Sequence, residues 1–140
     1  MDKIQRFKVP DPGASSLTFT VPNGTTGYWK LDSITAVLTT DATAATRLWA
    51  VRVNDGEGNL ISTWTNFQTQ TQSQALTTSW QRGMNIQGPS STGASGSIHM
   101  CAPDITLEEG DSITIFEIAG AAAGDRVTNC MITLRPVEPL

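Results

Sequence analysis

Residues 28–40 read YWKLDSITAVLTT and carry the clearest secondary-structure pattern in the chain. Apolar side chains alternate with polar ones, at Trp29, Leu31, Ile34, Ala36 and Leu38. A period of two is typical of a strand with one buried face. The apolar phase slips by one residue near Asp32 and Ser33, which predicts a β-bulge there.

Similar segments lie on both sides of this stretch, separated by residues that favour turns. We expect about eight strands, near residues 17–21, 28–40, 46–54, 60–65, 74–86, 98–102, 112–118 and 127–135. The segment NDGEGN, residues 54–59, predicts a hairpin loop, and residues 87–97 predict a flexible loop. This pattern predicts an all-β fold, an antiparallel β-sandwich that is jelly-roll-like. An immunoglobulin-like sandwich is the structural alternative.

The chain divides into a central domain with short extensions at both ends. We expect an extended N-terminal arm over residues 1–16, the sandwich over 17–135 and a short C-terminal tail over 136–140. Pro10 and Pro12 argue against regular structure in the arm. The arm could lie across a neighbouring subunit, or it could be a frayed terminus.

Composition supports a sheet protein and excludes some function classes. Of 140 residues, 39% are hydrophobic and 16% are charged, and threonine, which is β-branched, occurs 20 times. The net charge of −4 gives no basic face for nucleic acid. No apolar run approaches the ~20 residues of a membrane span, and the first ten residues do not resemble a secretory signal. Two cysteines are too few for a disulfide framework, so we expect a protein made in a reducing cytoplasm.

No group of residues predicts catalysis, a cofactor or a metal. His99 is the single histidine, too few for a triad or a catalytic zinc site. Strand phase directs Cys101 outward and Cys130 inward, which disfavours a disulfide between them. The acidic residues of loop 54–59 and of residues 108–111 fit solvated turns better than calcium or glycosidase sites. We therefore do not expect an enzyme.

Tryptophan is the most informative aromatic residue in the chain. Trp49 sits in a clean apolar phase and predicts a core position. Trp64 and Trp80 have polar neighbours, so they are candidate interface aromatics.

Several segments resemble a known group of proteins. Residues 28–40, the run VRVNDGEGNLI at 51–61 and LEEGDSI at 107–113 are similar to small jelly-roll virion proteins of tailed bacteriophages. The resemblance implies a head decoration (cement) protein, made in the host cytoplasm and bound to the exterior of an icosahedral capsid. It implies the major capsid protein as partner and a homotrimer, with neither nucleic acid nor membrane as a ligand. The arm residues expected to contact the capsid or a subunit are Lys3, Ile4, Arg6, Phe7 and Val9.

Other functions remain open at this stage. A carbohydrate- or receptor-binding domain of a tail fibre or spike would use exposed aromatics such as Trp64, Phe67 and Trp80. A trimeric extracellular ligand of the tumour-necrosis-factor type and an enzyme are weaker alternatives.

Overall fold

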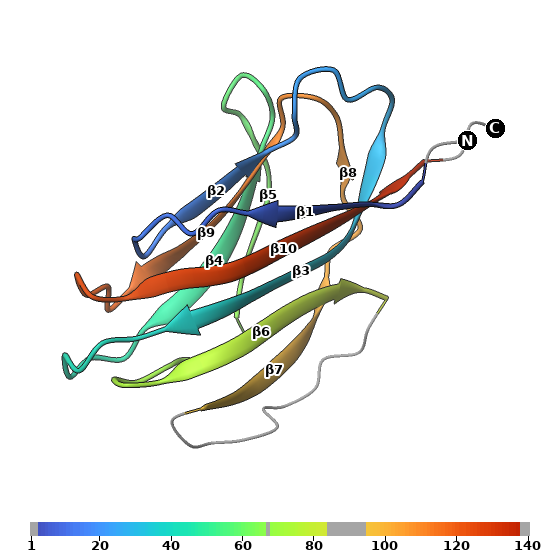
Figure 1. Ribbon diagram of the computed structural model, residues 1–140. Coiled ribbons are helices and arrows are strands. Elements are labelled where there is room, and N and C mark those ends of the chain that lie inside the picture. The colour runs from blue at the N-terminus through green and yellow to red at the C-terminus, as the bar shows by residue number, and fades with distance from the viewer. Residues whose placement is uncertain (1–2, 67, 84–94, 138–140) are drawn as a thin grey trace.

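The computed structural model describes residues 3–66, 68–83 and 95–137, which form two packed β-sheets (Figure 1). The strands, in chain order, are β1 (Gln5–Val9), β2 (Leu17–Thr20), β3 (Trp29–Thr39), β4 (Leu48–Asn54), β5 (Leu60–Thr65), β6 (Ala75–Arg82), β7 (Ser95–Ala102), β8 (Thr106–Leu107), β9 (Ser112–Ala119) and β10 (Arg126–Pro136). The predicted all-β sandwich is therefore confirmed.

The strand order brings together segments that are far apart in the chain. Sheet A has the order β1-β10-β3-β6-β7, with β8 also paired to β3, and sheet B has the order β2-β9-β4-β5. With β7 and β8 set aside, the other eight strands lie in the orders 1-8-3-6 and 2-7-4-5, counted along the chain. Among these eight, only the β4–β5 connection joins neighbours within one sheet, so the chain repeatedly crosses between the two sheets.

Strand β3 lies in the middle of sheet A, between β10 and β6. Thr133 pairs with Ser33 and Leu134 pairs with Leu31, which leaves Asp32 as an extra residue in β3. The predicted bulge is confirmed. It restores the inward phase after Asp32, so that Leu31 and Ile34 are both completely buried.

The core is formed by the inward-facing side chains of the two sheets. Trp49 and Trp80 are its largest fully buried side chains. The core position predicted for Trp49 is confirmed. A surface position for Trp80 is wrong, because Trp80 follows Leu76 and Thr78 on the inward face of β6.

The two cysteines lie on opposite sides of sheet A. Cys101 is exposed, Cys130 is buried, and both are free thiols. Burial raises the pKa of the Cys130 thiol to about 12, and the charge of Asp11 adds to this shift. Cys130 therefore behaves as a small apolar core residue, as strand phase predicts.

The structure corrects the expected arm. Residues 5–9 form β1, which pairs with β10 from Gln5↔Leu134 to Val9↔Cys130. Val9 is buried, and the Phe7 ring centroid lies 5.0 Å from that of Phe19 in β2. The prolines stop regular structure only after β1 has formed. Strand β1 is consequently an integral edge of sheet A.

Two further expectations change. The described residues contain ten strands instead of about eight, since β1 and β8 were not predicted, and β6 pairs with β7 in parallel rather than antiparallel. The loop expected at residues 87–97 extends too far toward the C-terminus, because residues 95–97 belong to β7. Its remaining residues, 87–94, lie outside the described residues.

Removal of residues 1–9 should destabilise the domain. We expect the free energy of unfolding to fall by about 3 kcal/mol or more, because a buried side chain such as Val9 contributes about 2 kcal/mol and the pairing with β10 is also lost. Urea denaturation followed by tryptophan fluorescence measures the change. Removal of residues 1–3, which precede β1, is the control and should leave the midpoint unchanged. Equal midpoints for both truncations would contradict an integral β1.

Candidate functional site

A buried arginine organises one end of the sandwich. Arg47 immediately precedes β4, and its side chain is fully buried. Its Nε donates to Asp125 Oδ2 at 3.0 Å, and its NH2 group donates to Asp41 Oδ1 at 2.9 Å and to Asp125 Oδ1 at 3.2 Å. The NH1 group donates to the carbonyl oxygens of Thr43 and Ala45, both at 2.8 Å. All five guanidinium N–H groups are thus satisfied.

The two aspartates connect loops that are distant in sequence. Asp125 Oδ1 accepts the backbone N–H of Asp41 at 2.8 Å, and Asp41 Oδ2 accepts the backbone N–H of Gly124 at 2.9 Å. The β3–β4 and β9–β10 loops therefore hold one another at the left-hand end of the sandwich in Figure 1. A Cβ atom on Gly124 would lie 2.5 Å from Asp41 Oδ2, so this contact requires glycine.

The protonation of this cluster depends on burial and on neighbouring charges. For Asp125, hydrogen bonds from Glu117 and Arg47 outweigh the opposing effect of burial and hold its pKa below the usual 3.8. For Asp41, the backbone N–H of Thr43 lowers the pKa most, and the N–H of Gly124 contributes. Both aspartates are thus ionised opposite Arg47 at neutral pH.

Glu117 of β9 is the exception in this cluster. Both of its carboxyl oxygens are buried, and no donor in the described part of the chain reaches them. Burial, reinforced by Asp125, raises the pKa of Glu117 from 4.5 to about 8. A protonated Glu117 donates its O–H to the Asp125 carboxylate, a bond that the ionised form cannot make. The cluster therefore consists of the Arg47 cation, two ionised aspartates and the neutral acid Glu117. These groups bind one another rather than facing an open site.

The acidic turns bind their own backbone. Asp55 Oδ1 accepts the N–H groups of Glu57 and Asn59, each at 2.9 Å, within the β4–β5 hairpin. Asp111 Oδ2 likewise accepts the N–H of Glu108 at 2.9 Å. Over residues 3–66, 68–83 and 95–137, no group of three or more His, Cys, Asp or Glu side chains is placed to hold a metal ion.

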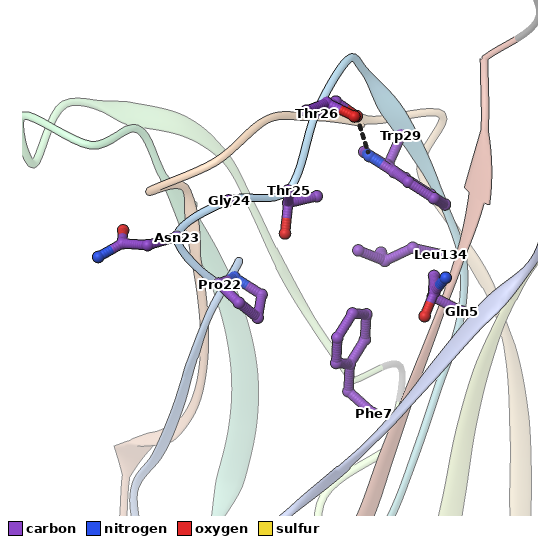
Figure 2. A pocket seen from close by; sticks show the side chains of 9 residues that line it. All are labelled: Gln5, Phe7, Pro22, Asn23, Gly24, Thr25, Thr26, Trp29 and Leu134. Carbon is purple, nitrogen blue, oxygen red and sulfur yellow. Dashed lines mark hydrogen bonds between the residues drawn. The ribbon is translucent and has the colours of Figure 1, made fainter. Parts of the chain in front are cut away.

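A pocket opens at the edge of the sandwich beside β1. This edge pocket has a volume of about 370 Å³ and is lined by Gln5, Phe7, Pro22, Asn23, Gly24, Thr25, Thr26, Trp29 and Leu134. In Figure 2, the Phe7 ring and Leu134 face Pro22 and Thr25 across the pocket, whereas the Asn23 side chain points away. The Trp29 indole N–H donates to the Thr26 carbonyl at 3.0 Å, which fixes one wall. The lining carries no charged side chain and combines apolar residues, such as Phe7 and Trp29, with polar ones, such as Gln5 and Thr25.

A second depression lies on the outer face of sheet A. This polar groove has a volume of about 270 Å³ and is lined by Arg6, Asp32, Ser33, Gln81, Arg82 and Thr133. Four of these residues form one cross-strand row, in which Arg6 pairs with Thr133, Thr133 with Ser33, and Ser33 with Gln81. Asp32 has ion pairs with Arg135 at 3.3 Å and with Arg82 at 3.6 Å. Arg6 has no ion-pair partner among the residues described.

The predicted contact residues fall on different surfaces. Lys3, Ile4 and Arg6 are exposed. Phe7 is half-buried and lines the edge pocket, whereas Val9 is buried in the core and is not available for contact.

The candidate interface aromatics are similarly divided. Trp64 of edge strand β5 is half-buried and packs against the core, and Trp80 is completely buried. Phe67 lies outside the described residues. Sequence reasoning missed the Arg47 cluster, because no local pattern connects residues 41, 47, 117 and 125.

Comparison with known proteins gives no relative. No protein-family model, curated protein or solved structure matches the chain. Among the described residues, no helix has the length and apolar character needed to cross a membrane.

Substitution of Arg47 should be severely destabilising. We expect Arg47→Met to reduce the free energy of unfolding by about 3–5 kcal/mol, because the buried Asp125 carboxylate would lose its counter-ion and the partly exposed Asp41 would lose its ion pair. Arg52→Met is a matched control, since Arg52 is exposed and lies over the Phe116 ring. Urea denaturation measures both variants. A stable Arg47→Met protein would show that the cluster does not hold this end together.

Glu117 should make stability fall with increasing pH. Between pH 4.5 and about 8 the unfolded chain has released the Glu117 proton while the folded chain retains it, so each rise in pH favours unfolding. Asp41 and Asp125, whose pKa values are lowered, lose their stabilising effect only in more acidic solution. Thermal unfolding from pH 5 to 8 should show a falling Tm, and Glu117→Gln should flatten this dependence. The exposed Glu109→Gln variant should retain the slope, and an unchanged slope in Glu117→Gln would rule out this assignment.

Proposed function

We propose that this chain is a non-enzymatic structural protein of a virion, a capsid decoration protein that binds and stabilises the exterior of an icosahedral phage head. The resemblance of residues 28–40, 51–61 and 107–113 to small jelly-roll virion proteins of tailed bacteriophages suggests this role. The strand orders 1-8-3-6 and 2-7-4-5, which leave out β7 and β8 of sheet A, favour this role, because repeated crossing between two facing sheets is typical of jelly rolls.

The observation that carries the proposal is the surface around β1. This strand is the edge of sheet A, with cationic side chains on its outer face and Phe7 in the edge pocket on its inner face. Arg6, Lys8, Lys30, Arg82 and Arg135 all lie on the outer face of sheet A or at its border. The acidic partners described for this group are Asp32 and Asp104. A chain with a net charge of −4 thus gathers positive charge on one sheet, which suits contact with an acidic surface.

Oligomerisation would increase the effect of each contact. We propose a homotrimer, whose repeated contacts would bind a capsid by avidity even when each is weak. Exposed apolar residues away from β1, including Leu60 and Ile61 of edge strand β5 and Ile118 of β9, supply surface for contacts between subunits.

The alternative is a carbohydrate- or receptor-binding domain of a tail fibre or spike. Burial of Trp80 removes one of its expected aromatic platforms. The edge pocket favours this saccharide-binding alternative, because an uncharged pocket with Phe7, Trp29 and the Thr25 hydroxyl suits a neutral saccharide.

Cosedimentation with capsids tests the proposed role. The chain, mixed with undecorated capsids assembled from the major capsid protein of the same phage, should pellet with them at a saturating ratio and raise their melting temperature. Light scattering of the free chain should give about three times the mass of one chain. Failure to pellet, together with binding on a glycan array, would replace the decoration role by the alternative.

A further inference from the structure

Strand β1 presents a free edge with two different sides. It is the terminal strand of sheet A, paired with β10 on one side, and no strand in the described part of the chain lies on the other. We infer that this edge accepts an extended segment of the partner protein, in which apolar residues alternate with acidic ones. The inference rests on the proposed function, since it specifies the chemistry by which the capsid protein would be recognised.

The inner side of the edge fits an apolar residue. Gln5, which is exposed, and Phe7, which is half-buried, line the edge pocket from β1, and residues 22–26 after β2 form the opposite wall. A strand added beside β1 would continue the pleat of sheet A, so its inward residues would lie level with Phe7. The pocket has a volume of about 370 Å³, and its lining combines apolar with uncharged polar residues. It has room for an aliphatic or aromatic side chain on the side where Phe7 and Leu134 lie (Figure 2).

The outer side of the same edge fits acidic residues. Arg6 and Lys8 alternate with the inward residues and are exposed. The nearest acid in the polar groove, Asp32, already binds Arg82 and Arg135, and neither Arg6 nor Lys8 has an ion pair within the described residues. Directly opposed residues of neighbouring strands lie about 5 Å apart, close enough for glutamate or aspartate to pair with these cations.

Charge also argues against a second copy as the occupant. If β1 paired with β1 of another copy about a two-fold axis at Phe7, Arg6 would lie opposite Lys8 twice. Like charges placed directly opposite one another destabilise a strand pair. The geometry therefore selects a foreign segment with the complementary charge pattern, held through main-chain hydrogen bonds and side-chain pockets.

Hydrogen exchange with model peptides tests the inference on the full chain. The probe is a seven-residue peptide of alternating valine and glutamate, and the control peptide has lysine in place of glutamate. We expect the glutamate peptide to slow exchange at β1 amides and the lysine peptide to have no effect. Arg6→Glu should weaken binding of the glutamate peptide about tenfold, whereas Arg52→Glu, the same charge change on sheet B, should not.

Capsid binding separates failure of this inference from failure of the proposed function. If the chain coats capsids and Arg6→Glu coats them equally well, the β1 edge is not the recognition site, although the decoration role stands. If the peptide binds without protecting β1 amides, the contact is only electrostatic and strand addition is refuted. Absence of capsid binding by the unmodified chain would refute the proposed function itself.

Discussion

Pairing of β3 with both β10 and β6 is the constraint on which the rest of the sandwich depends. Strand β3 must bury Leu31, Ile34 and Ala36 against sheet B while its other face meets solvent. A one-residue slip in register would exchange these faces, so the bulge at Asp32 is needed to keep both halves of the strand in phase. Once β3 is aligned, β10 positions β1 and β6 positions β7, because each of these strands takes its register from the neighbour that is already aligned.

The Arg47 cluster closes one end of this sandwich with polar chemistry rather than apolar packing. Its value is geometric, since one planar guanidinium with five donors binds two carboxylates and two carbonyl groups at once. Burying these charged groups removes them from water, which costs free energy, and only their ion pairs and hydrogen bonds with one another offset that cost. Glu117 brings an additional acid into this environment, and the raised pKa of Glu117 keeps it neutral near Asp125. Ion pairs and hydrogen bonds of the Arg47 cluster thus hold the loops at one end of the sandwich, and the edge pocket lies at the opposite end.

Strand β1 belongs both to the core and to the proposed contact surface. Its inward residues help to build the core and line the edge pocket, and its outward residues carry positive charge that no ion pair within residues 3–66, 68–83 and 95–137 neutralises. Strand β1 is therefore both an edge of sheet A and the carrier of the surface to which we assign partner binding. This dual role explains why the contact residues expected in the arm divide, with Val9 buried and Arg6 exposed.

Local alternation and turn chemistry are enough to predict several features of this fold. These include the sheet class, the bulge at Asp32, the β4–β5 hairpin and the opposite orientations of Cys101 and Cys130, because each follows from side-chain phase or backbone preference within a few residues. Which strands become neighbours depends instead on contacts that form when the two sheets assemble. The parallel pairing of β6 with β7, the recruitment of residues 5–9 as β1 and the burial of Trp80 behind a polar-looking strand all depend on contacts between distant segments. The Arg47 cluster is the extreme case, since four loop and strand positions spread over residues 41–125 interact only after both sheets have formed, and local periodicity carries no information about such pairing.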